Sequence, residues 1–470
     1  MKNIFKMHNI NMILTGTLMF CSVFSTTAQQ VKTSYFMKSS NVRTHLNPAF
    51  QPERGYVSIP VLGGIQADFS TNGVVLDNFI YPVNGKTVTF MDNAVDTEAF
   101  LKNLKENNQL NMNAYTTILS AGWYKGQGFW TVDLSLKGQA NASVPKSMFE
   151  FMKRGNSESG SVYNISDIQL RSDAYMEAAL GYSRPINEKL TLGAKAKVLL
   201  GIGSMETNID QLRAELSADK WTITSSGSLS VAMKGLEPEF KRDEESTDRP
   251  EYISGFDFDS PGISGFGLGV DLGANYQLTE NISLSASILD LGFISWSKSA
   301  ITTASTTNES FVFDGFELPL GDHTTGKSVD EQFNQIQDDL EDLFRFSETT
   351  SEGRSSRLRT SVLLGGEYRL LENKLGFGLV SSTYFYQPKI MTEITVSANY
   401  RPIDWFEATL SYSVLHSDLK TYGLALNFSP SWINFFIGSD YMPTKVNPQF
   451  IPVSGPAASL YCGISIPLKN

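Results

Sequence analysis

Cysteine and histidine are scarce in this sequence. It holds two cysteines and four histidines among 470 residues. Cys21 lies in a segment that we expect to be removed, which leaves Cys462 alone, so no internal disulfide can form. None of the three histidines after that segment, His45, His323 and His416, has a second histidine or a cysteine at metal-ligand spacing. We therefore predict no metal and no cofactor.

Long apolar runs and basic clusters are also missing. After Ala28 there is no run of about eighteen apolar residues, so the sequence predicts no helical membrane span. The formal net charge is −11, and no basic cluster offsets it. This charge balance argues against nucleic acid as a partner.

Residues 1–28 have the pattern of a secretory signal peptide. Lys2 and Lys6 supply positive charge, Ile13–Phe24 is a brief apolar core, and Ser25–Ala28 offers small residues before a cleavage site. The core is too short to span a bilayer comfortably. Because the segment carries two lysines and no acidic residue, cleavage would move the net charge from −11 to −13. An exported chain is a soluble periplasmic protein, a secreted protein or an outer-membrane barrel.

Alternation of apolar and polar residues recurs from about Gly55 to the end of the chain. In Leu190–Leu200, leucine, alanine and valine alternate with threonine, glycine and two lysines, Lys195 and Lys197. Successive side chains of a strand point to opposite faces, so each such segment has one apolar and one polar face. A soluble sandwich packs the apolar face in its core, whereas a membrane barrel turns it toward lipid.

The turns favour the barrel. Five strands end in an aromatic residue on the apolar face, followed by a short polar turn; these residues are Tyr182, Tyr276, Tyr368, Tyr400 and Phe428. A row of aromatic side chains marks a membrane interface. The connections at the other end include much longer ones, which is the asymmetry of outer-membrane barrels. The sequence therefore predicts an all-β, transmembrane antiparallel β-barrel in the outer membrane.

We predict about fourteen strands within residues 55–470, an even number that brings the C-terminus back to the side of the N-terminus. A further hairpin near Trp221–Met233 either stands above the membrane or adds a pair of strands. The expected strands lie at about 55–69, 113–124, 128–141, 171–184, 189–204, 264–278, 281–297, 358–371, 374–386, 392–401, 405–416, 420–429, 432–442 and 458–468.

Four long loops are expected on the extracellular side, at about 70–112, 142–170, 205–258 and 298–357. Three of them carry helical spacing, within 96–107, 145–152 and 328–346. Such helices either cap the loop region by packing on each other, or their apolar faces line an entrance for hydrophobic ligands or dock a partner. The apolar face of the last one comprises Phe333, Ile336, Leu340, Leu343 and Phe344.

One short motif carries a family resemblance. A signal peptide, the element Asn47-Pro48-Ala49 in "THLNPAF" and about fourteen strands resemble the FadL-type superfamily of outer-membrane barrels. "DLGFISW", Asp290–Trp296, resembles a strand end of the PorV-like members. The resemblance implies a transporter of fatty acids or hydrocarbons, or a barrel that accompanies type IX secretion, and it points to an uncharacterised branch of this group.

The resemblance also implies that Asn47, Pro48 and Ala49 belong to an N-terminal hatch that constricts the lumen. Only residues 29–54 lie between the expected cleavage site and the first strand, which is shorter than the hatch of FadL-type transporters. We therefore expect a short insert that narrows the lumen instead of a complete plug.

Charged residues on the polar strand faces are expected to line the lumen. One reading is a network of ion pairs around the N-terminal segment, because isolated buried charges are costly. The other is a polar channel wall, whose mixed signs argue against strong ion selectivity. These residues are Asp68, Asp133, Glu177, Lys195, Lys197, Asp271, Glu367, Arg369, Arg401, Glu407 and Asp440.

We do not expect an enzyme, because the adjacent His416 and Ser417 point to opposite strand faces and are poorly placed to form a nucleophile-base pair. Two other functions follow from this pattern. The first is passive uptake or export of a small hydrophobic ligand, with lateral or periplasmic exit; Pro60, Gly63 and Gly64 interrupt the first strand and are candidates for a lateral gap. The alternative is a non-transporting barrel whose loops dock a secretion complex or a surface lipoprotein. Outer-membrane lipid surrounds the protein in either case.

Overall fold

A computed structural model describes most of the chain. The described residues are 31–83, 86–154, 161–216, 221–242, 251–260, 262–313, 346–385, 390–415, 419–442, 445–446, 452–454 and 457–468. The predicted signal peptide, His323, His416 and the five apolar residues Phe333, Ile336, Leu340, Leu343 and Phe344 lie outside them.

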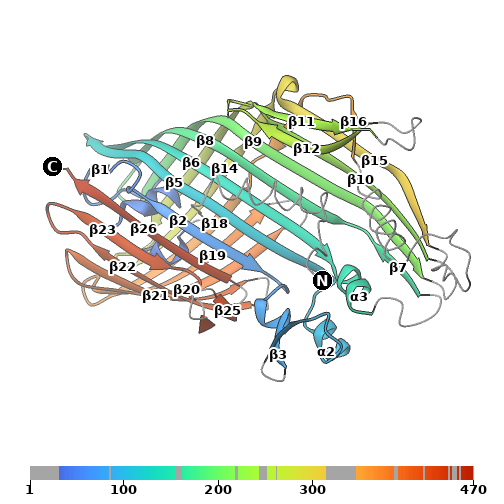
Figure 1. Ribbon diagram of the computed structural model, residues 1–470. Coiled ribbons are helices and arrows are strands. Elements are labelled where there is room, and N and C mark those ends of the chain that lie inside the picture. The colour runs from blue at the N-terminus through green and yellow to red at the C-terminus, as the bar shows by residue number, and fades with distance from the viewer. Residues whose placement is uncertain are drawn as a thin grey trace, which may run out of the picture.

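Fourteen antiparallel strands close into a barrel, as the sequence predicts (Figure 1). Each strand pairs with its neighbours along the chain, and the last strand pairs with both parts of the first. The strands are β1 Tyr56–Ser58 with β2 Ile65–Thr71, β5 Asn107–Lys125, β6 Gly128–Pro145, β8 Ile168–Pro185, β9 Leu190–Leu216, β13 Gly265–Gln277, β14 Ile282–Trp296, β17 Arg354–Arg357 with β18 Thr360–Leu370, β19 Leu375–Phe385, β20 Met391–Ile403, β21 Phe406–Leu415, β22 Leu419–Phe428, β23 Asn434–Ser439 and β26 Ala457–Pro467.

The outer face of the barrel is apolar and the inner face is polar. On β20, the outward side chains of Ile394 and Val396 are exposed, whereas Thr395 between them is buried. The same alternation places Leu410 outside and Thr409 inside on β21. A continuous apolar exterior around a polar interior is the arrangement that lipid stabilises. No helix in the described part of the chain is long and apolar enough to cross a membrane.

One side of the barrel rises far above the other. β9 runs to Leu216, well past the expected end near residue 204, and pairs with β10 Trp221–Met233, which in turn pairs with β15 Ile301–Phe313. The expected loops 205–258 and 298–357 were therefore partly wrong, because both contain strands. Smaller strands of this region are β7 Ser161–Ile165, β11 Leu236–Lys241, β12 Tyr252–Phe258 and β16 Ser347–Thr349.

One face of this extension is covered. Leu212 and Leu216 pack with Ile223 against α3 Lys146–Arg154, and Leu229 packs with Ile253 further along β10. On the other face, Arg213 and Glu215 are exposed. The pairing of β9 with β10 shifts register between Ser226 and Gly227, and parity counting along a strand fails at such an irregularity.

Short helices cover part of the long-loop rim. Asp96 caps the N-terminus of α2 Thr97–Lys102, because its side chain accepts a hydrogen bond from the Ala99 amide. Phe100 of α2 packs with Phe149 of α3, so these two helices contact each other as the first reading of the loops predicts. The remaining short elements are η3 Leu76–Asn78, η4 Lys298–Ala300, β3 Ile80–Val83, β4 Lys86–Thr89, β24 Lys445–Val446 and β25 Pro452–Ser454.

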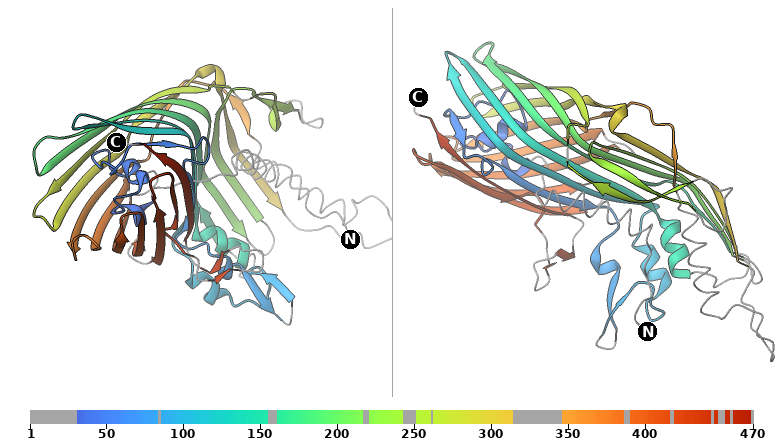
Figure 2. Two further views of the ribbon diagram at one scale, coloured as in Figure 1. Left: turned by 90° about the vertical axis from the view of Figure 1, so that its left-hand side faces the viewer. Right: turned by 45° about the horizontal axis from the view of Figure 1, so that its top comes forward.

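The N-terminal segment lies inside the barrel, near the rim with the short turns. We call residues 31–55 the hatch; it contains η1 Lys32–Ser34 and η2 Asn41–His45. Figure 2 shows this segment enclosed by the strands when the barrel is viewed from the end that carries the C-terminus. Tyr35, Leu46 and Asn47 of the hatch are each almost completely buried.

A lysine on the outer face tests the membrane-spanning arrangement. Val396→Lys, in the middle of β20, should lower the free energy of unfolding by about 2–4 kcal/mol, because the charge would face hydrocarbon. Ile403→Lys, at the short-turn end of the same strand, should cost about 1 kcal/mol or less. Urea unfolding of the barrel in lipid vesicles measures both, and equal losses would contradict a lipid-facing β20.

Candidate functional site

Asn47 fastens the hatch to one wall of the barrel. Its Nδ2 donates to the carbonyl oxygens of Ala274 on β13 and Ala286 on β14, both at 3.1 Å. Its Oδ1 accepts a hydrogen bond from the Ala49 amide at 2.9 Å, which holds the turn around Pro48. The carboxamide therefore links the Asn-Pro-Ala turn directly to the backbone of two strands.

Two strand glycines let the hatch lie directly on this wall. A Cβ atom at Gly273 would overlap with Asn47 Oδ1, and one at Gly193 would overlap with the Pro48 carbonyl. Glycine in a strand interior allows such a close approach of another backbone segment. The predicted hatch residues Asn47, Pro48 and Ala49 thus meet a surface shaped to receive them.

The opposite wall holds the start of the hatch through carboxylates. Asp440 accepts hydrogen bonds from the amides of Lys32 and Thr33 at 2.9 and 2.8 Å. Glu407 accepts from the amides of Lys38 and Ser39. The hatch therefore crosses the lumen and is attached on both sides of it.

Lys32 adds a buried charge pair to this attachment. Its ammonium group pairs with Glu393 on β20 and contacts the Tyr441 hydroxyl. The side chains of Lys32 and Glu393 are 1% and 4% exposed. Breaking a buried pair of this kind is strongly destabilising, because it leaves the remaining charge buried without a partner.

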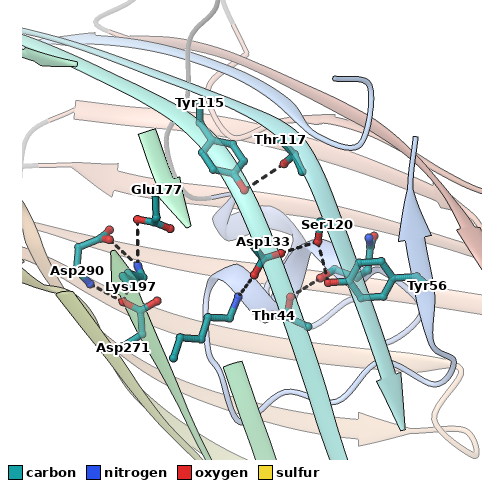
Figure 3. Close-up of polar contacts among 12 residues, drawn as sticks. Thr44, Tyr56, Tyr115, Thr117, Ser120, Asp133, Glu177, Lys197, Asp271 and Asp290 are labelled. Atoms are coloured by element: carbon teal, nitrogen blue, oxygen red, sulfur yellow. Dashed lines mark hydrogen bonds and ion pairs between the residues drawn. The ribbon is translucent and has the colours of Figure 1, made fainter. Parts of the chain in front are cut away.

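A second ion-pair network lies on β6, β8, β9, β13 and β14, the wall to which Asn47 is fastened (Figure 3). Lys197 Nζ lies 2.7 Å from Asp271, 2.6 Å from Asp290 and 3.6 Å from Glu177. Lys137 bridges Glu177 and Asp290 at 2.7 and 3.3 Å. Every one of these two lysines and three carboxylates has an oppositely charged partner, so no charge in the network is isolated.

Lys195 forms a separate pair beside this network. Its Nζ lies 2.8 Å from Asp133, which also accepts a hydrogen bond from the Ser120 hydroxyl at 2.5 Å. Figure 3 shows Asp133 and Ser120 near Tyr56 and Thr44, where the wall meets the hatch.

The predicted lumen charges fall into several groups instead of one site. Glu177, Lys195, Lys197 and Asp271 belong to the paired wall. Glu407 and Asp440 hold the hatch. Asp133, paired with Lys195, also belongs to the paired wall. The other four lie apart: Asp68 accepts from Asn113, Arg369 lies 3.7 Å from Glu367, and Arg401 pairs with Glu53 at the short-turn rim.

Sequence reasoning missed Lys137 and Asp290. Lys137 continues the alternation that includes Asp133 on β6, so the pattern itself could have identified it. Asp290 has a φ of +56° at a register irregularity of β14, and Leu289 and Asp290 both contact interior groups. Parity counting fails at such a bulge. The Asp-Leu-Gly motif that begins at Asp290 was the sequence feature that could have pointed to this residue.

A cavity of about 130 Å³ lies between the hatch and the wall. Val42, His45 and Leu46 of the hatch border it, together with Leu289 and the Lys197 network. His45 lies outside the membrane-spanning strands, and burial lowers its pKa to about 4, so its imidazole is neutral at pH 7. Other lining residues are Gly63, Gly64, Tyr115, Tyr175, Phe436 and Tyr461.

The first strand is interrupted where it borders this cavity. Ser58 pairs with Ser465 and Ile65 pairs with Cys462, so the six residues between Ser58 and Ile65 face only two on β26. Backbone hydrogen bonds still close the wall, from the Ile59 amide to Ile464 and from the Thr117 amide to Gly64. We call residues 59–64 the wall bulge; Val61 within it has a φ of +66° and is 54% exposed on the outside.

Within the described residues, no group of three histidine, cysteine, aspartate or glutamate side chains is placed to hold a metal ion. The polar groups of the lumen are arranged to pair with one another and with the hatch. The arrangement can constrict the lumen and enclose a small molecule.

Fold and hatch together define a membrane-spanning β-barrel whose lumen is crossed by its own N-terminal segment. The chain belongs to the family described as "Family of unknown function (DUF5723)", which matches residues 48–440. This is an uncharacterised family, as the sequence resemblance led us to expect. No curated protein matches the chain.

Several solved structures are similar to the chain. The toluene transporter TodX of P. putida is 11% identical, with 91% of this chain and 92% of that chain covered and a TM-score of 0.38. A FadL homologue of Pseudomonas aeruginosa is 10% identical, with 94% and 98% covered and a TM-score of 0.42. The translocator domain of the autotransporter NalP from Neisseria meningitidis is 7% identical, with 89% and 90% covered and a TM-score of 0.31. FadL-type barrels are thus among the similar structures, but at these values the likeness carries no argument about function.

Removing the Asn47 carboxamide tests the first attachment of the hatch. Asn47→Ala deletes three hydrogen bonds, so we expect a loss of about 2–4 kcal/mol in the free energy of unfolding. The hatch should also loosen, which planar-bilayer recordings would detect as increased conductance. Asn187→Ala is the matched control, because its Oδ1 accepts two amide hydrogen bonds in an exposed turn. Unchanged conductance and stability in Asn47→Ala would mean that the motif is only a linker turn.

Removing the Lys197 ammonium tests the compensated wall. Lys197→Met leaves three carboxylates close together in a buried site, so the barrel should lose about 3–5 kcal/mol of unfolding free energy. Arg242→Met, which breaks the exposed pair with Glu251, should cost about 1 kcal/mol or less. Urea unfolding at pH 7 compares the two, and a similar small loss in both would show that the wall network adds little stability.

Proposed function

We propose that the barrel passively transports a small hydrophobic ligand across the outer membrane. The observation that carries this proposal is the position of the cavity. It lies against the hatch on one side and reaches Gly63 and Gly64 of the wall bulge on the other. A ligand in the cavity is therefore next to the only interruption that we find in the described first strand.

The size and charge of the cavity favour a small, uncharged ligand. An apolar cavity of about 150 Å³ binds benzene, so about 130 Å³ suits a molecule of monoaromatic size. Leu46, Leu289 and Phe436 supply apolar contacts. The lysines Lys137 and Lys197 are fully ion-paired, so they offer an anionic ligand little net attraction.

A lateral exit fits the contacts better than a periplasmic one. Passage through the hatch requires the attachments at Asn47 and at Asp440 to break. At the wall bulge, Pro60 has no amide hydrogen to donate, and Val61 occupies a backbone region that is strained for a β-branched residue. Strain of this kind collects at ligand clamps and switches. We therefore place the exit at Pro60, Gly63 and Gly64, which opens toward lipid.

Filling the passage at Gly64 tests this function. A Cβ atom at Gly64 would lie 2.8 Å from Thr117 Oγ1, so Gly64→Val places its side chain between the cavity and the wall bulge. We expect uptake of radiolabelled toluene by cells that produce the variant to fall about tenfold or more. The reason is that extra methyl groups forced into a closely packed passage cost on the order of 1–3 kcal/mol.

Gly353→Ala is the matched control, because its Cβ would meet only the Trp296 carbonyl at 3.7 Å. Heat-modifiable mobility on gels shows whether each variant forms a barrel. Equal uptake by Gly64→Val and the wild type would contradict the lateral route. Uptake no higher than in cells that lack the barrel, together with a protein that co-purifies at fixed stoichiometry, would instead favour the docking function.

A further inference from the structure

A groove of about 550 Å³ lies on the outer surface of the barrel, away from the hatch and the cavity. Phe266 and Leu268 of β13 and Phe293 of β14 form its walls, with Ile263 at its upper end. These four side chains are between 46% and 60% exposed. Ser295, directly paired with Phe266, and Ser297 leave the space between the larger side chains. No carboxylate lines the groove.

The groove lies at the level of the extracellular interface of the membrane. Tyr276 marks the short-turn interface on the same strand, and ten residues separate it from Phe266. Ten residues of strand rise about 33 Å. At a strand tilt of about 40°, this corresponds to a height of about 25 Å, which is the height of the apolar band of an outer-membrane barrel. The groove therefore lies where the headgroups and upper acyl chains of the outer leaflet pack.

Three exposed cationic residues surround the groove. Arg357 of β17 is paired directly with Phe293, and Lys298 follows Ser297 in the chain. Lys234 donates its amide to the Ser264 hydroxyl at 2.8 Å, and its side chain packs beside Gly262. In the described part of the molecule, none of the three forms an ion pair. This differs from the lumen wall around Lys197, where each cation has a carboxylate partner.

We propose that this groove binds an outer-leaflet lipid with an anionic, phosphate-bearing headgroup. An acyl chain lies between Phe266, Leu268 and Phe293. The phosphate lies among Lys234, Lys298 and Arg357, and the serine hydroxyls donate hydrogen bonds to headgroup oxygens. Charge complementarity selects this occupant, because unpaired cations beside an apolar groove at a membrane interface match an anionic amphiphile. The site is independent of transport through the lumen.

Native mass spectrometry of the full chain tests the proposal. The barrel is purified in mild detergent and mixed with equal amounts of phosphatidylglycerol and phosphatidylcholine that carry the same acyl chains. We expect the wild type to retain one phosphatidylglycerol in preference to phosphatidylcholine by about tenfold or more. The triple variant Lys234→Gln, Lys298→Gln, Arg357→Gln should lose this preference.

Lys420→Gln is the matched control, because Lys420 is an exposed cation on β22, at the long-loop end of the opposite wall. It should keep the wild-type preference. Phe266→Ala with Phe293→Ala should lower retention of both lipids, which separates the acyl contact from the phosphate contact. Equal retention of the two lipids by the wild type would overturn the proposal, as would the same loss in Lys420→Gln as in the triple variant. If the triple variant does not form a barrel, the single variant Arg357→Gln decides by the same comparison.

Discussion

The carboxamide of Asn47 is the interaction on which the interior of this barrel depends. It reaches the carbonyl oxygens of two paired strands and at the same time closes its own turn onto Ala49. A barrel of fourteen strands has a lumen too wide for its wall side chains alone to fill. By fixing the hatch across that lumen, Asn47 holds in place the hatch residues that border the cavity on one side, and the wall bulge borders it on the other.

Charge compensation explains how so polar an interior remains stable. Lys32 with Glu393, Lys195 with Asp133, and Lys197 with three carboxylates are buried pairs, and each would be costly if one partner were removed. Compensation also removes the net field that would select ions. The interior is therefore suited to hold the hatch and to accommodate an uncharged ligand. Lys234, Lys298 and Arg357, which form no ion pair in the described part of the molecule, lie outside, beside the groove on β13 and β14.

Much of the fold was predictable because lipid imposes a simple rule on every strand. Outward positions such as Val396 and Leu410 must be apolar, so alternation and aromatic strand ends are enough to count fourteen strands. The β9–β10 extension was missed because its pairing shifts register between Ser226 and Gly227, which interrupts the alternation along β9. The site was less predictable. Asn47 reaches partners 227 and 239 residues away, and Asp290 lies at a bulge where parity reverses.

Exit through the wall does not require the hatch to move. A disulfide between the hatch and the wall tests this route. Thr33 Oγ1 and Ser411 Oγ are 2.8 Å apart, so Thr33→Cys with Ser411→Cys can be bridged in a chain that also carries Cys462→Ser. Uptake of radiolabelled toluene is compared in oxidised and reduced cells. If the ligand leaves through the wall, uptake should be equal in both states. Uptake that is lost on oxidation and restored on reduction would contradict it, because the ligand would then have to pass through the hatch.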